Sequence, residues 1–171
     1  MSLNKLEKFI NVKNIAVEKC RELDYFKKGA LFCSINGNNI ILLNEDFYSR
    51  DRKEQIEILA EECGHYATTV GDMTKVSSYK ERLDIDKAEL KARQWGANFL
   101  IDSGSLKKAL ITCQTLDEVL DELDISYNIL NDYMTKLSLQ GQYLELGNGY
   151  KLNLYKLPSL IKERSDLHET T

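Results

Sequence analysis

Residues 58–66 of this chain read Ile58-Leu59-Ala60-Glu61-Glu62-Cys63-Gly64-His65-Tyr66. The apolar residues in and around this segment recur at helical spacing, which predicts an amphipathic helix with one face in the core. Glu61 and His65 are four positions apart, so a helix projects both side chains from the same face. Glu62 lies about 100° further round the helix, near enough to reach the same space. The segment therefore predicts a helix that carries a cluster of polar side chains beside its buried face.

The spacing matches the zinc-binding helix H-E-x-x-H, in which two histidines bind the metal and the glutamate is the general base. Here Glu61 replaces the first histidine, and a carboxylate oxygen is an accepted zinc ligand. Glu61 and His65 are thus candidate metal ligands, and Glu62 is a candidate base. The alternative is a solvated helix face that binds nothing. Gly64 favours the metal site, because glycine inside a helix costs about 0.8–1 kcal/mol and indicates close packing at that point.

A second helix, predicted over residues 84–102, offers a third ligand. Glu89, Ala92 and Gly96 fall on one face of it, and the two small residues would let the helix press against another. Glu89 would then point into the contact between the helices. The alternative is that Glu89 is a surface charge paired with Arg93 at i+4, and the spacing leaves both readings open. Less favoured carboxylates for this position are Asp72, Glu81, Asp84 and Asp86.

The residues before the site helix predict one or two covering helices, followed by a β-hairpin. Residues 4–24 predict one or two helices with an imperfect apolar stripe. Residues 30–44 predict a β-hairpin about Asn36-Gly37, because Asn-Gly supplies the positive φ angles of a tight turn. One strand of this hairpin could be an exposed edge beside the site helix. An extended peptide could add to such an edge through backbone hydrogen bonds.

The site helix also carries signals for both of its ends. Asp51, with Glu54 three residues later, predicts an N-cap of the capping-box type. Gly71 suits a C-terminal cap and predicts that the helix stops near Val70-Gly71-Asp72. The predicted helix therefore spans the whole polar cluster.

Composition limits the class of protein. The chain has 171 residues, 43% of them hydrophobic, which is enough for a core in one domain or in a domain with an appendage. No signal-peptide pattern and no apolar run of membrane-spanning length is present, so we expect a cytoplasmic protein that does not enter a membrane. The four cysteines form no C-x-x-C pair and predict free thiols. Cys63, on the apolar side of the site helix, predicts a small buried residue.

The C-terminal part, residues 104–171, predicts a different architecture. A short helix over 105–113 is followed by one capped by Thr115 and another capped by Ser126. A hairpin about Asn148-Gly149 comes next. This order resembles a winged helix-turn-helix. We therefore expect two domains, residues 1–103 and 104–171.

The charge of this C-terminal part argues against DNA binding, the usual role of a winged helix-turn-helix. Residues 104–171 contain seven Lys or Arg and ten Asp or Glu, a net charge of −3 (7 − 10), and the whole chain carries −4. Phosphate contacts supply most non-specific affinity for DNA, so an acidic reader of DNA is disfavoured. Packing or docking of a substrate is the favoured role, and DNA binding is the alternative.

The residues above resemble the ImmA/IrrE metallopeptidase family. Three features carry the resemblance: the hairpin leading into the site helix, the segment from Leu59 to Asp72, and the pattern Glu89-x-x-Ala92-x-x-Trp95-Gly96. It covers residues 25–101 well and the C-terminal part loosely. The chain is most similar to phage and prophage members, which often have glutamate in place of the first histidine.

The resemblance implies an α+β fold: a minimal zincin-like core of a short antiparallel sheet, a site helix and a ligand helix, with the winged helix-turn-helix-like appendage. It implies Glu61, His65 and Glu89 as metal ligands and Glu62 as the catalytic residue. The cofactor would be zinc, with manganese as the alternative because oxygen-rich ligation loosens selectivity. Tyr66 and Tyr79 are candidates by proximity alone for stabilising an oxyanion.

The function implied is that of a cytoplasmic anti-repressor, a peptidase that cleaves a helix-turn-helix repressor of a prophage or mobile element. The alternative is a non-catalytic regulatory binding protein with a vestigial or structural metal site. Glu61, in place of the first histidine, is the sequence feature that leaves both the peptidase and the non-catalytic regulator open.

Overall fold

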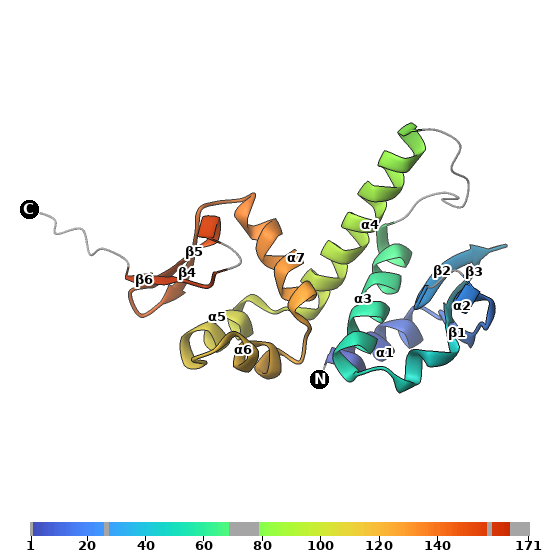
Figure 1. Ribbon diagram of the computed structural model, residues 1–171, viewed down its shortest axis with the longest axis horizontal. Coiled ribbons are helices and arrows are strands. Elements are labelled where there is room, and N and C mark those ends of the chain that lie inside the picture. The colour runs from blue at the N-terminus through green and yellow to red at the C-terminus, as the bar shows by residue number, and fades with distance from the viewer. Residues whose placement is uncertain (1, 26–27, 69–78, 157–158, 165–171) are drawn as a thin grey trace, which may run out of the picture. The chain divides into compact units, whose positions relative to one another are not determined.

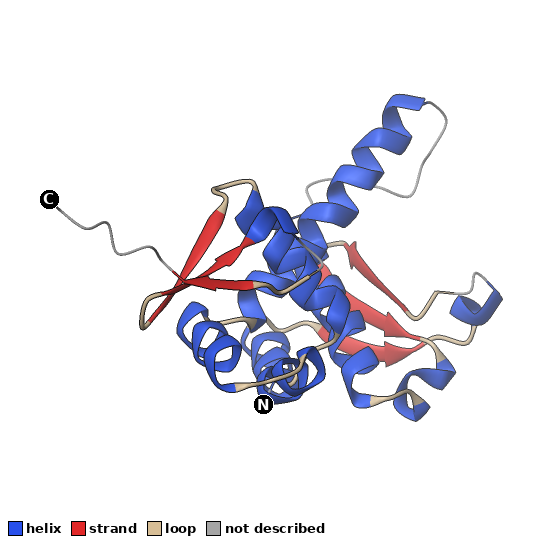
Figure 2. Ribbon diagram, turned by 60° about the vertical axis from the view of Figure 1, so that its left-hand side comes forward, coloured by secondary structure: helices blue, strands red, loops and turns tan. Residues whose placement is uncertain are grey.

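The computed structural model describes residues 2–25, 28–68, 79–156 and 159–164, and of residues 79–82 only the helical backbone. Within these residues the chain forms seven α-helices and two three-stranded sheets, so the predicted α+β class is confirmed (Figures 1 and 2). It divides into two compact units, Met1–Leu100 and Ile101–Thr171. The sequence had placed this division after residue 103. No helix in the described part of the chain is long and apolar enough to span a bilayer.

The sheet of the first unit contains the predicted hairpin. Its strands are β1 (Ala16–Lys19), β2 (Ala30–Ile35) and β3 (Asn38–Leu43), in the order β1-β3-β2. β2 and β3 are antiparallel and joined through Asn36 and Gly37, whose φ angles of 52° and 82° confirm the predicted turn. β1 pairs with β3 in parallel. The order leaves β2 at one edge of the described sheet, beside helix α3 (Figure 1).

The prediction of helix throughout residues 4–24 was wrong in its second half. Helix α1 (Ser2–Val12) is followed by strand β1 and by one short turn of helix, α2 (Glu22–Tyr25). Asn14 adopts a left-handed conformation, φ 52°, which ends α1 and turns the chain. The next residues pair with a strand distant in sequence, Val17 opposite Ile41, and local periodicity carries no information about such a partner.

Two long helices form the rest of the first unit, after a short 3-10 turn, η1 (Glu45–Ser49). They are α3 (Arg52–Thr68) and α4 (Tyr79–Leu100). The side chain of Asp51 accepts the Glu54 amide at 3.2 Å, which confirms the predicted N-cap of α3. The predicted end of this helix at Gly71 lies outside the described residues. α4 stops at Leu100, because Asp102 instead caps the next helix by accepting the Ser105 amide at 2.8 Å.

α3 and α4 lie against each other through small residues (Figure 1). A Cβ atom added at Gly64 would lie 2.1 Å from the Ala92 carbonyl oxygen, and one added at Gly96 would lie 2.7 Å from the Ala60 carbonyl oxygen. Each helix thus contributes a small residue and a glycine one turn apart, and the two pairs meet in antiparallel order. This contact explains the helical glycine, and it brings Glu89, about one turn before Ala92, to the level of His65.

The second unit begins with three helices and continues with a sheet. The helices are α5 (Ser103–Thr112), α6 (Leu116–Leu123) and α7 (Tyr127–Ser138). The predicted caps are present: the Thr115 hydroxyl accepts the Glu118 amide at 3.2 Å, and the Ser126 hydroxyl accepts the Ile129 amide at 3.3 Å. The sheet follows, in the order β4 (Tyr143–Gly147), β5 (Tyr150–Asn153) and β6 (Lys162–Arg164), with a 3-10 turn η2 (Leu154–Lys156) after β5.

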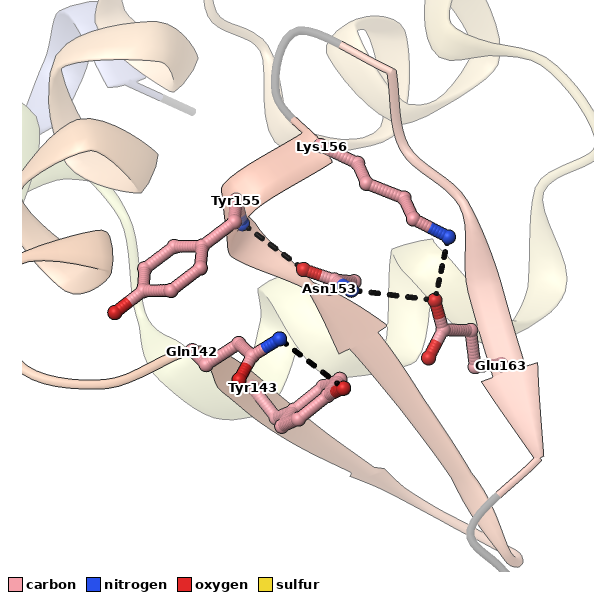
Figure 3. Close-up of polar contacts among 6 residues, drawn as sticks. All are labelled: Gln142, Tyr143, Asn153, Tyr155, Lys156 and Glu163. Carbon is pink, nitrogen blue, oxygen red and sulfur yellow. Dashed lines mark hydrogen bonds and ion pairs between the residues drawn. The ribbon is translucent and has the colours of Figure 1, made fainter.

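The hairpin about Asn148-Gly149 was predicted, but strand β6 was not. Lys-Glu-Arg shows no strand pattern, and β6 is tied to its neighbours by polar side chains (Figure 3). Glu163 accepts hydrogen bonds from Asn153 at 3.3 Å and from Lys156 at 2.9 Å. Asn153 in turn accepts the Tyr155 amide at 3.0 Å. These contacts hold Tyr155 and Lys156 of η2 and the middle of β6 against the end of β5.

Candidate metal centre

The contact between α3 and α4 brings three candidate ligands together. Glu61 and His65 project from α3 and Glu89 from α4, and one donor atom of each lies within 4.8 Å of the others. The His65 Nε2 atom is 3.2 Å from the Glu89 Oε2 atom. All three side chains are half-buried. The structure therefore places Glu89 beside His65, the arrangement that a third ligand requires.

Of the other carboxylates considered for the third position, Asp84 and Asp86 are not brought to this cluster. Asp84 and Asp86 are exposed on α4, and Asp84 contacts Lys87 at 3.5 Å. Asp72 and the side chain of Glu81 lie outside the described residues. Within the described part of the chain, Glu61, His65 and Glu89 form the group of donors that could hold a metal ion.

Glu61 lies where its carboxyl group and that of Glu89 favour a proton or a cation between them. The pKa of Glu61 is raised to about 7, first by burial and then by the hydrogen-bonded carboxyl of Glu89 and its charge, against a smaller opposing effect of Arg93. Two carboxyl groups in hydrogen-bonding contact require a proton or a cation between them. The donor set, two carboxylate oxygens and one imidazole nitrogen, is one that zinc accepts. The residues present thus fit a divalent metal ion.

Glu62 lies outside this donor group and is more deeply buried. Its side chain retains 8% exposure, and its Oε2 atom accepts the main-chain N–H of Phe32 on β2 at 2.5 Å. The pKa of Glu62 is raised to about 7, chiefly by burial and also by the charges of Glu61 and Glu89, while the hydrogen bond from the Phe32 amide opposes the rise. A carboxyl group whose pKa lies near neutral pH is suited to taking up and releasing a proton.

A cluster of aromatic side chains, which the sequence did not reveal, lies beside the site. Phe32 and Tyr66 are 5.8 Å apart between ring centroids, Phe9 is 5.8 Å from Tyr66 and 5.0 Å from Trp95, and Trp95 stacks on Phe99 at 4.9 Å. The rings come from β2, α3, α1 and α4, so they fix these four elements around the residue that follows His65. In the sequence, the pair Trp95 and Phe99, one turn apart on α4, was the feature from which this aromatic cluster could have been predicted.

The remaining candidates have clear positions. Cys63 is fully buried, and burial raises the pKa of its thiol to about 12, so it is the small core residue that was predicted. All four cysteines are free thiols. Tyr66, proposed for an oxyanion, has its ring among Phe9 and Phe32, while Tyr79 has no described side chain.

Comparisons of the chain with protein-family models, with curated proteins and with solved structures find no match.

Proposed function

We propose that the chain is a zinc-dependent peptidase with a zincin-like N-terminal core. Glu61, His65 and Glu89 hold the metal, and Glu62 is the general base. The observation that carries the proposal is the convergence of these three donors within 4.8 Å, with a buried carboxyl on the next position of the same helix. The sequence resemblance to the ImmA/IrrE family supports the same assignment of roles.

The bound metal would supply Lewis acidity that polarises the scissile carbonyl group. Glu62 takes a proton from the attacking water and passes it to the leaving nitrogen. Glu61 and Glu89 contribute two negative charges to the site, which offset the charge of a divalent cation. We therefore expect a weaker Lewis acid than a site with two histidines provides, and a slower peptidase.

Strand β2 offers a place for the substrate. Ser34 and Ile35 are exposed at the edge of the sheet, and an extended peptide can pair with such an edge. On the basis of the resemblance, we propose a helix-turn-helix repressor of a prophage or mobile element as the substrate, and the cytoplasm as the compartment. We propose a winged helix-turn-helix-like architecture for the second unit, and docking of this substrate as its role.

A second function, that of a non-catalytic regulatory protein with a structural metal site, is favoured by one observation. Glu62 is 8% exposed and already engaged by a main-chain amide, which limits access of a substrate to the base. In this reading the metal would hold α3 and α4 together, and the protein would act by binding its partner.

Substitution of Glu62 separates the two functions. Glu62→Gln should keep the fold and the metal but lose about 10²–10⁴-fold in turnover, because the positioned base is gone. Glu61→Gln should instead lower metal occupancy first. Cleavage of a panel of purified helix-turn-helix repressors, with products identified by mass spectrometry, is the measurement.

Glu61→His serves as the gain-of-function control, since it restores the usual ligand pair. If the parent and Glu61→His are both loaded with zinc and neither cleaves a repressor that the parent binds tightly, the regulatory function replaces the peptidase.

A further inference from the structure

The hydrogen bond between Phe32 and Glu62 joins the edge of the sheet to the base. In an antiparallel strand the N–H and C=O of one residue point to the same side, and the sides alternate along the strand. The Phe32 amide donates to Glu62 rather than to β3, so Phe32 and Ser34 direct their backbone groups to the free side of β2. The amide that reaches Glu62 is therefore one that the sheet leaves unused.

Glu62 needs this donor. A carboxylate with 8% exposure has lost most of its water, and burying it without a hydrogen bond is costly. Among the described residues, the Phe32 amide is the hydrogen-bond donor to Glu62. A bond from an N–H group to a charged oxygen is short and strong, and here it holds the Oε2 atom and leaves the Oε1 atom without this constraint.

We propose that the main-chain amide of Phe32 is a positioning group for the general base. It rests on the proposed function: by fixing one oxygen of Glu62, the amide orients the other toward the cluster of Glu61, His65 and Glu89. A flexible glutamate side chain without this bond would sample several rotamers, and proton transfer depends on placement within hydrogen-bonding distance. The Phe32 ring, packed on Tyr66, holds the strand that carries the amide.

Amide hydrogen exchange in the full chain tests the bond itself. The Phe32 amide should be protected, whereas the Ser34 amide on the same free edge should exchange rapidly. Glu62→Ala should remove the protection of Phe32, and Glu61→Gln, on the neighbouring residue, should leave it in place. Exchange of Phe32 as fast as that of Ser34 in the parent would overturn the proposal.

An ester in place of the amide tests the positioning role. Phenyllactic acid at position 32 removes the N–H donor and keeps the ring; lactic acid at position 34, compared with Ser34→Ala, is the matched control. The probe is acetohydroxamic acid, which chelates zinc and presents an acidic hydroxyl to a neighbouring base. The ester at position 32 should weaken binding of this probe to the zinc-loaded protein about 10- to 100-fold, the range for a hydrogen bond to a charged group.

Zinc affinity, measured by calorimetry on the same proteins, should not change, because Glu62 is not a ligand. An ester at position 32 that binds the probe as well as the parent does would refute the positioning role. The ester at position 32 could weaken probe binding without changing zinc affinity while the zinc-loaded parent cleaves no repressor. That result would refute the peptidase function and leave the positioning role. A parent that binds no zinc would remove both.

Discussion

At the scale of single residues, the carboxyl groups of Glu61 and Glu89 dominate the candidate metal centre. They are in hydrogen-bonding contact, and burial together with this contact raises the pKa of Glu61 to about 7. In the proposed site, a divalent cation would replace the proton between them and remove their repulsion. The affinity for metal and the response to pH therefore depend on the same pair.

Removal of a ligand should weaken zinc binding. Loss of a residue that only hydrogen-bonds to a metal ligand lowers metal affinity about 10- to 100-fold. His65→Ala and Glu89→Gln remove a ligand itself, so each should lower zinc affinity by more than this. Asp86→Asn, an exposed carboxylate of the same helix, is the control. Calorimetric titration with zinc and manganese gives the comparison, and a His65→Ala variant that binds as tightly as the parent would show that the site is wrong.

The raised pKa of Glu61 predicts how the metal-free protein responds to pH. The folded carboxyl has a pKa of about 7, above its ordinary value of 4.5, so the folded state binds the proton more tightly. Its contribution to stability is present below the unfolded pKa and is lost as the pH rises through about 7. Relative to Glu61→Gln, the metal-free parent should therefore lose stability between pH 5 and pH 8.

Zinc should reverse this trend, since its ligands must be deprotonated and its affinity rises over the same interval. Thermal melts of parent and Glu61→Gln in a chelator, and then with zinc, provide the measurement. A parent that gains stability over Glu61→Gln as the pH rises without metal would contradict the assignment.

At the scale of elements, the distance between α3 and α4 is set by backbone contact. Gly64 meets the Ala92 carbonyl and Gly96 meets the Ala60 carbonyl, so no side chain separates the helices there. Glu89 reaches His65 because of this contact. Any group added at the contact should push the ligand helix away from the ligands on α3.

Gly64→Ala tests this contact. The added Cβ would lie 2.1 Å from the Ala92 oxygen, so the helices must separate. Overpacking of this kind costs about 1–3 kcal/mol, which exceeds or offsets the gain of about 1 kcal/mol in helix propensity. Urea unfolding should show a loss of stability, and zinc titration a loss of affinity. Gly141→Ala, with open space around it, should change neither; equal zinc affinity for Gly64→Ala and parent would refute the coupling.

Some elements of the fold could be predicted from residues close together in the sequence, and others could not. Hairpin β2–β3, the caps at Asp51, Thr115 and Ser126, and the small-residue face of α4 all follow from residues close in sequence, and the sequence predicted them. β1 depends on a partner distant in sequence, and β6 depends on the contacts of Glu163 with Asn153 and Lys156; the residues of neither segment specify a strand. The Phe32 amide is a main-chain group without a sequence signature, so its bond to Glu62 could be found only in the structure.

At the scale of the whole molecule, charge is unevenly distributed in the second unit. Residues 103–138, with helices α5 to α7, contain three basic and six acidic residues (3 − 6 = −3), whereas residues 142–164, with the sheet, contain four basic and two acidic (4 − 2 = +2). A helix that enters a DNA groove needs basic neighbours to offset the phosphates. The helical part of this unit has the opposite charge.

We therefore expect the full chain not to bind duplex DNA. Electrostatic attraction would be strongest at low salt, where screening is weakest. Fluorescence anisotropy of a labelled duplex should show no complex at micromolar protein in low salt. As a positive control for charge, a variant with Asp117, Asp121 and Glu122 replaced by lysine should gain salt-sensitive affinity; a micromolar or tighter complex of the parent would contradict the expectation.

The glycine contact between α3 and α4 also bears on ionic size. Zinc binds oxygen and nitrogen at about 2.0–2.2 Å, whereas calcium requires about 2.3–2.6 Å and more ligands. Because the two helices already touch through their backbones, they cannot approach further, and they can separate only by giving up that contact. A larger ion would have to open the helix pair, so the energy of helix packing is added to the cost of binding it. The same two glycines that bring the ligands together would thus act as a size filter for the ion.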